Sequence, residues 1–312
     1  MTSLWSGPAV RAAQWLAGLA IVAFAARSLV RNWSELRSQP LAWEVEPGWL
    51  VLSAIVVWMM YALLAFAWRT MLAGWGQEVD GWTAARIWTV SSLGKYLPGK
   101  VWAVAGMALM AQRAGIAPWA ATGSAIVLQV LAIGSGAAVA GLTGRGAIEA
   151  AYPGAGLSLG LLVAAAVVGV LLLLWPPFLR RLLRFASSDD ASRSTPPAIG
   201  IGLGIVANLV AWLGYGVALW MLARGLLPSA GLRPALAIAV FTASYLAGFL
   251  ALFAPGGLGV REGLFILMLQ GPLGIGAATA LALASRVLLT ITEVGAAVPF
   301  LIRPHWRARV AP

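Results

Sequence analysis

Long apolar runs constrain this sequence more than any other feature. Six predominantly apolar runs of about twenty residues or more lie at about residues 12–30, 48–73, 117–141, 155–175, 198–223 and 273–302. A helix of roughly 20 apolar residues spans the hydrocarbon core of a bilayer. Only 10% of the residues are charged, whereas a soluble domain needs roughly 25% to cover its core. The sequence therefore predicts an all-α polytopic membrane protein, with residues 1–312 forming a single membrane domain of about six full spans.

The first run has features of both a signal peptide and a membrane helix. Arg11 precedes it, and the small-residue segment "AFA" lies within it, as in a cleavable leader. Because many further spans follow, we expect this helix to remain uncleaved and to form the first span.

Two further apolar stretches, 83–112 and 234–270, are interrupted by the segments "LPGK" and "APGGLG". The helical arms on either side of the first interruption would be about 24 Å and about 18 Å long, less than the roughly 30 Å of the hydrocarbon core. We therefore predict two Pro-Gly-broken re-entrant hairpins, which enter and leave on one side of the membrane. In the second stretch residues 234–253 could span alone, and in both the Pro-Gly pair could only kink a helix.

Arginine placement predicts the orientation of the spans, because cytoplasmic loops carry an excess of Lys and Arg. The loop at 176–197 and the C-terminal tail are rich in arginine, whereas 142–154 contains only Arg145. We therefore expect the loop 176–197 and both termini to be cytoplasmic and 142–154 to face outward. Three arginines near residues 27–37 favour the opposite orientation.

The two interrupted stretches also indicate an internal repeat. Placing Pro98 on Pro255 aligns the glycines that follow them, and each half then consists of two spans, one interrupted stretch and one long span. With the orientation above, the interrupted stretches begin on opposite sides of the membrane. The halves 1–142 and 153–302 are therefore predicted to form an inverted repeat of the kind found in many transporters, whose broken helices meet near the bilayer midplane.

The interrupted stretches carry the residues best suited to bind an anion. A helix that begins after Pro-Gly presents unpaired N–H groups and the positive end of its dipole, and the chain's only two lysines flank the first break. Three glycines after the second proline let backbone approach a ligand closely. The predicted substrate-binding residues are Lys95, Pro98, Gly99, Lys100, Pro255, Gly256, Gly257, Gly259, Arg261, Glu262 and Arg286. Their expected ligand is a phosphate-bearing lipid headgroup, although the lysines could instead only snorkel to the interface.

Glu262 and Glu293 are the only two carboxylates inside apolar runs. Arg286 and Glu293 are seven residues apart and so lie on one helix face. We expect these two to pair, or to form a buried network with Arg261 and Glu262. Either acid could instead carry a coupling proton, and Glu262 could simply compensate the helix dipole.

The composition argues against several other kinds of site. The chain has no cysteine and a single histidine, His305, which lies in the basic tail. Disulfides, thiolate sites and His-based triads are therefore not expected, and we predict no metal, no cofactor and no catalytic residue. The net charge of +11 is spread over loops and ends, which indicates contact with anionic lipid and not with nucleic acid.

The segments "GKYLPGKVW", "APGGLGVREG" and "ASRVLLT" resemble the membrane domain of lysylphosphatidylglycerol synthetases, also called the flippase-like membrane family. The resemblance spans most of the chain; Arg286 matches the arginine of the family's final helix, whereas Glu293 is not placed by the family pattern. It implies a role in moving or handling phospholipid-linked substrates. In the two-domain synthetases a separate soluble domain transfers lysine from charged tRNA to phosphatidylglycerol, and we expect this chain to be a stand-alone member without that domain. Stand-alone relatives are also associated with glycosyltransferase or isoprenoid-lipid pathways, so the resemblance leaves the lipid open.

These features together predict a flippase-like lipid translocator, or a lipid-binding transport protein, in a bacterial-type inner (cytoplasmic) membrane. Its substrate would be an anionic phospholipid or another lipid-linked headgroup. The alternative is a non-transporting partner that anchors a lipid- or glycan-modifying enzyme. A membrane-embedded transferase would lack an evident nucleophile, and an ATP-driven pump would lack a phosphate-binding loop. We further expect Lys100 to face an interior cavity near residues 255–257, and Lys95 to lie nearer the entrance of that cavity.

Overall fold

The computed structural model describes residues 45–96, 102–151, 198–251 and 254–302, with five isolated positions between 164 and 177. In this part of the chain every regular element is helical, as predicted. The elements are α3 (Pro47–Gly74), α4 (Gly81–Ser92), η1 (Leu93–Tyr96), α5 (Trp102–Arg113), α6 (Pro118–Ala151), α9 (Ala198–Leu226), η3 (Pro228–Ala230), α10 (Pro234–Leu250), η4 (Pro255–Gly257) and α11 (Val260–Ile302). The predicted first span and most of the predicted span at 155–175 and loop at 176–197 lie outside the described residues.

Four of these helices are long and apolar enough to cross a membrane: α3, α6, α9 and α11. They coincide with four of the six apolar runs of the sequence. The helix α6 is longer than its apolar run, because it continues through Arg145 to Ala151. Polar residues do not end a helix by themselves, and the next strong helix breaker is Pro153, which disfavours helical backbone in the residue before it.

The two interrupted stretches are broken close to where the sequence predicts. The first forms α4 and α5, which have 12 residues each and are therefore about 18 Å long, too short to cross a bilayer. The second forms α10, of 17 residues, then η4 and the first part of α11. Within α11 the backbone of Gly274 is non-helical, with φ 80° and ψ 158°. This irregularity follows the predicted arm 260–270 and lies at the start of the predicted span 273–302.

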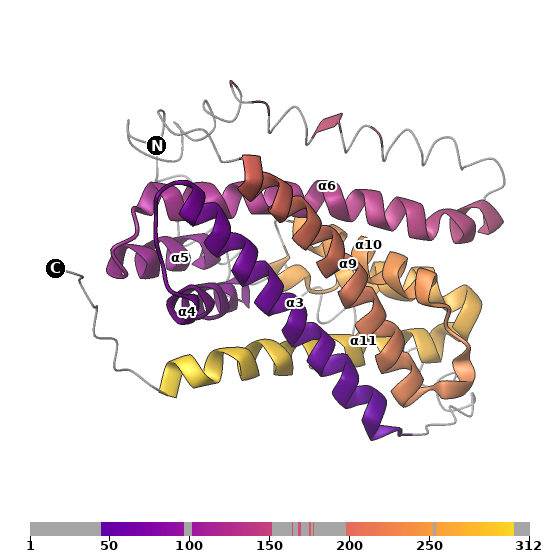
Figure 1. Ribbon diagram of the computed structural model, residues 1–312. Helices are drawn as coiled ribbons and strands as arrows, with labels where there is room; N and C mark the ends of the chain where they lie inside the picture. The colour runs from indigo at the N-terminus through magenta and orange to yellow at the C-terminus, as the bar shows by residue number, and fades with distance from the viewer. Residues whose placement is uncertain are drawn as a thin grey trace, which may run out of the picture.

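The helices pack in a reciprocal arrangement. The helices α3 and α9 lie side by side across the molecule, as Figure 1 shows. The first arm of the second interrupted stretch, α10, packs on α6, and the first arm of the first interrupted stretch, α4, packs on α11. The short turns η1 and η4 also contact each other. Each interrupted stretch therefore packs against the long helix of the other half, and the two breaks meet.

Small residues allow these helices to approach closely. A Cβ on Gly216 of α9 would lie 2.3 Å from the Cα of Ile238 in α10, and one on Gly136 of α6 would lie 2.9 Å from the ring of Trp212. Such close backbone contacts drive helix association in membranes, where burial of apolar surface contributes little. The glycines of the long spans therefore serve as packing faces.

Asp80 caps the N-terminus of α4, which carries the first break. Its carboxylate accepts a hydrogen bond of 3.0 Å from the backbone N–H of Thr83. Hydrogen bonding by the side chain of Thr83, and to a smaller extent by its backbone, holds the pKa of Asp80 below its ordinary value. Replacing such a cap by alanine costs about 1 kcal/mol. Asp80→Ala should therefore lower the melting temperature of the detergent-solubilised protein at pH 7.

The effect should depend on pH in a defined direction. A group whose folded-state pKa is depressed contributes stability above its unfolded pKa, and this contribution disappears as the pH falls through the folded pKa. The difference in melting temperature between Asp80→Ala and the unmodified protein should therefore shrink below about pH 4. Asp80→Asn, which keeps a capping oxygen, should resemble the unmodified protein at pH 7; an equal loss in both variants would contradict the capping role.

Candidate functional site at the two helix breaks

Lys95 lies in the short turn η1 that follows α4. Its ammonium group forms an ion pair with the carboxylate of Glu293 on α11. The Tyr61 hydroxyl of α3 donates a second hydrogen bond of 2.9 Å to the same carboxylate oxygen. The side chain of Glu293 is only 5% exposed, whereas that of Lys95 is 30% exposed. A buried carboxylate on one half of the chain is therefore neutralised by a more accessible cation from the other half.

The second break depends on glycine. Gly256, Gly257 and Gly259 have φ values of 58°, 70° and 81°, in the left-handed region that residues with a Cβ rarely adopt. A Cβ on Gly257 would also lie 2.8 Å from the Cα of Gly248 in α10. Glycine thus lets the chain reverse directly against α10 before α11 begins.

Glu262 stabilises the start of α11 and binds a cation at the same time. One carboxylate oxygen accepts a hydrogen bond of 2.7 Å from the backbone N–H of Gly259, the arrangement of a capping box. The other oxygen pairs with Arg286 at 2.6 Å. Both terminal nitrogens of Arg286 also lie 3.5 Å from the carbonyl oxygen of Gly256. Arg286 therefore ties the middle of α11 to the second break.

Arg261 is held differently from the other cations. It is 7% exposed, and its guanidinium lies 5.4 Å from the ring centres of both Phe241 and Tyr245 of α10. One terminal nitrogen donates a hydrogen bond of 3.1 Å to the Ser285 hydroxyl. Among the described residues no carboxylate lies within ion-pair distance of Arg261. Aromatic rings favour a nearby cation but do not neutralise it, so this buried positive charge lacks a direct counter-charge from the described part of the chain.

The structure brings most of the predicted site residues together. Lys95 lies in η1, which contacts η4. Gly256 and Gly259 of the second break contact the Glu262–Arg286 pair. Pro98, Gly99 and Lys100 lie outside the described residues, so the placement of Lys100 stays a prediction.

One predicted pairing is wrong. Arg286 pairs with Glu262, and Glu293 pairs with Lys95, whereas the seven-residue spacing predicted an Arg286–Glu293 pair. Residues on one helix face can each find a partner on a neighbouring element, and here the two breaks supply those partners. The sequence reasoning also missed Tyr61 and Ser285, and the Phe241–Tyr245 pair, whose four-residue spacing on an apolar helix was the available signal.

The geometry can bind an anion. Three basic side chains and the N-terminus of α11 lie near the place where the short turns η1 and η4 contact each other, inside a protein whose long helices are apolar. No curated protein matches the chain. The family model described as "Lysylphosphatidylglycerol synthase TM region" matches residues 14–292. This range includes both interrupted stretches with Lys95, Arg261, Glu262 and Arg286, whereas Glu293 lies one residue beyond it. The chain therefore belongs to the lysylphosphatidylglycerol synthase TM region family of membrane proteins.

Proposed function

We propose that this protein is a flippase-like lipid translocator, or a lipid-binding transport protein, for an anionic phospholipid or another lipid-linked headgroup. One observation carries the proposal: Lys95, Arg261 and Arg286 gather at two helix breaks that contact each other within an apolar helical protein. Charged side chains at membrane depth are costly and mark substrate or ion pathways. A headgroup phosphate would supply the counter-charge that Arg261 lacks among the described residues.

The proposed architecture is an inverted repeat of about six spans and two re-entrant hairpins. The reciprocal packing supports it, because α4 contacts α11 in the way that α10 contacts α6, while α3 pairs with α9 and η1 pairs with η4. A two-fold relation between the halves 1–142 and 153–302 would produce this pattern of contacts. In transporters built from such repeats, the broken helices enclose the substrate site.

The second candidate is a non-transporting membrane partner that anchors a lipid- or glycan-modifying enzyme. The two ion pairs favour it, because Glu293 and Glu262 already neutralise Lys95 and Arg286, as in a structural network. In both cases we propose that the chain is not itself an enzyme, since its sequence offers no cysteine and one histidine. An assay of lipid movement separates the two candidates.

The deciding experiment is a translocation assay in proteoliposomes with lipids that carry a fluorophore on one acyl chain. If the protein is a translocator of anionic lipid, labelled phosphatidylglycerol should cross faster than labelled phosphatidylcholine. Arg261→Ala should abolish the difference, whereas Arg224→Ala should preserve it, because Arg224 lies at the end of α9 beside Trp49 and Trp220, outside the cluster. No movement above that of protein-free vesicles would favour the anchor.

The orientation can be tested separately with single cysteines, because the chain has none of its own. We expect a bacterial-type inner membrane location with both termini cytoplasmic, since arginine-rich segments stay inside. A cysteine at Gly146 should then react with a membrane-impermeant maleimide in intact cells, and one at Ala311 should react only after permeabilisation. The opposite labelling pattern would overturn the proposed orientation.

A further inference from the structure

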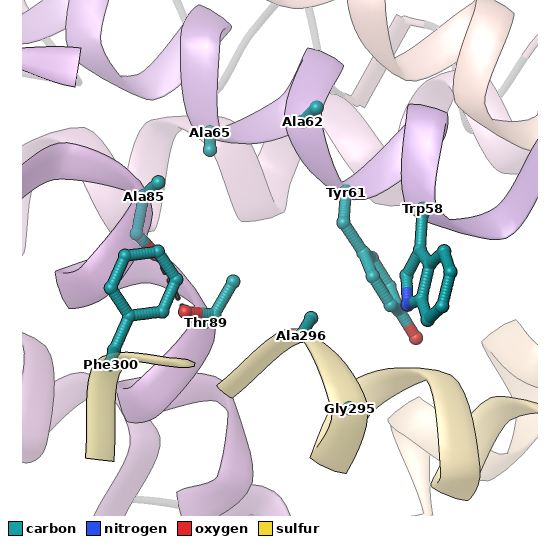
Figure 2. A pocket seen from close by; sticks show the side chains of 9 residues that line it. All are labelled: Trp58, Tyr61, Ala62, Ala65, Ala85, Thr89, Gly295, Ala296 and Phe300. Atoms are coloured by element: carbon teal, nitrogen blue, oxygen red, sulfur yellow. Dashed lines mark hydrogen bonds between the residues drawn. The ribbon is translucent and has the colours of Figure 1, made fainter. Parts of the chain in front are cut away.

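A cavity of about 310 Å³ lies between α3, α4 and α11, beside the charged cluster. Figure 2 shows Trp58 and Tyr61 at one end of it and Phe300 with Ala85 at the other. The volume is at the lower end of the range of roughly 300–1,000 Å³ for ligand sites. The space exists because alanine and glycine line its middle on both walls, where any larger side chain would fill it.

The polar atoms of the lining side chains are already occupied within the protein. The Trp58 indole N–H donates to the carbonyl oxygen of Thr292 at 2.9 Å, and the Tyr61 hydroxyl donates to Glu293. The Thr89 hydroxyl donates to the Ala85 carbonyl of its own helix at 2.7 Å. A polar ligand would therefore find few free partners, and the cavity suits an apolar chain.

One side of the cavity reaches the outer surface of the helices. Trp58 is 46% exposed, and its neighbours on α3 and α11 include exposed apolar residues such as Met59 and Val294. In a membrane such a surface faces lipid chains. At the Phe300 end the ring of Trp82 packs against the ring of Phe300, with ring centres 4.6 Å apart. At the other end Tyr61 connects it to Glu293 and so to Lys95.

We propose that this cavity binds one acyl chain of the phospholipid whose headgroup is handled at the charged cluster. The proposal rests on the proposed function and adds to it a hydrocarbon subsite. An apolar slot, open to lipid on one side and ending at a Lys–Glu pair, matches a molecule that is hydrocarbon at one end and anionic at the other. The Tyr61 hydroxyl marks the boundary between the two parts.

The test uses phosphatidylglycerol with a photoreactive diazirine in one acyl chain, reconstituted with the full-length protein in phosphatidylcholine vesicles. Cross-linked peptides are identified by mass spectrometry after irradiation. We expect labelling concentrated on the cavity walls of α3, α4 and α11. Ala296→Phe and Ala62→Phe fill the cavity from opposite walls and should each reduce this labelling at least about fivefold, because the displaced methylenes lose their apolar contacts.

Val298→Phe is the matched control. Val298 lies two residues from both Ala296 and Phe300, so it points about 200° away from them on α11, and it does not line the cavity. This variant should label like the unmodified protein. Equal labelling in Ala296→Phe and Val298→Phe, or labelling spread evenly over all lipid-facing helices, would overturn the proposal. The melting temperature of each variant verifies that it folds. Ala296→Phe on α11 and Ala62→Phe on α3 fill the cavity independently, so each tests the proposal without the other.

The photolabelling result can be distinguished from the result of the translocation assay. Selective translocation without cavity labelling would refute the acyl-chain subsite alone. Cavity labelling without translocation would refute the transporter and leave the subsite in place. Equally strong labelling by a phosphatidylcholine with the same diazirine chain would overturn the link between the cavity and the anionic headgroup site.

Discussion

The double variant Arg286→Met, Glu262→Gln should fold about as stably as the unmodified protein and should no longer bind anionic lipid tightly. Arg286→Met alone leaves Glu262 as a largely buried charge whose one remaining partner among the described residues is the N–H of Gly259. Breaking such a pair from one side costs about 3 kcal/mol, the lower end of the range for buried pairs, whereas replacing both partners by neutral groups is often neutral. The double variant therefore restores stability without restoring the cation.

Lipid binding is measured as the rise in melting temperature that phosphatidylglycerol causes in detergent, compared with phosphatidylcholine. A hydrogen bond to a charged group contributes roughly 1.5–3 kcal/mol, so the apparent affinity for phosphatidylglycerol should fall at least about tenfold. If Arg286 serves only to hold the second break, the double variant should bind as tightly as the unmodified protein. That result would show that Arg286 does not bind the lipid, and Arg261 would then be tested separately.

The helices of this fold could be predicted from the sequence because their signals are local. Apolar runs long enough to span a membrane predicted α3, α9 and the second part of α11 to within a few residues of their observed ends. Proline and glycine restrict or free the backbone where they stand. The division of the first interrupted stretch into two short helices, and the break of the second at η4, were therefore also predicted. The end of α6 was not predicted. Arg145 indicates the orientation of the span in the membrane, but an arginine does not stop a helix.

The sequence analysis identified the charged residues of the cluster but did not predict which of them form ion pairs. Lys95, Arg261, Glu262, Arg286 and Glu293 were all identified, since a charge in an apolar run is conspicuous in the sequence. Their pairing was not predictable, because Lys95 and Glu293 are 198 residues apart and meet only when η1 packs beside α11. The nearby spacing of Arg286 and Glu293 suggested a contact within one helix, but tertiary packing supplied each residue with a better partner.

The Lys95–Glu293 pair leads to the second large effect. Lys95→Met would remove the cation that pairs with the carboxylate of Glu293, whose side chain is 5% exposed, and should destabilise the protein by about 3 kcal/mol or more. Glu293→Gln should instead be tolerated, because the amide oxygen can still accept the hydrogen bond from Tyr61 and no buried charge is left unpaired. Glu78→Gln, a change at an exposed acid in the segment before α4, is the control for loss of one negative charge.

Binding and transport should respond to Glu293→Gln in opposite directions. In the unmodified protein an anionic headgroup competes with Glu293 for Lys95, which remains 30% exposed and so can be reached. Without that competitor phosphatidylglycerol should bind about tenfold more tightly, the equivalent of about 1.4 kcal/mol and near the value of one charge-assisted hydrogen bond. A conduction site must also release its substrate, so translocation in proteoliposomes should become slower although binding improves. A purely structural pair would leave both quantities as they are in Glu78→Gln, and that result would exclude Lys95 from the lipid site.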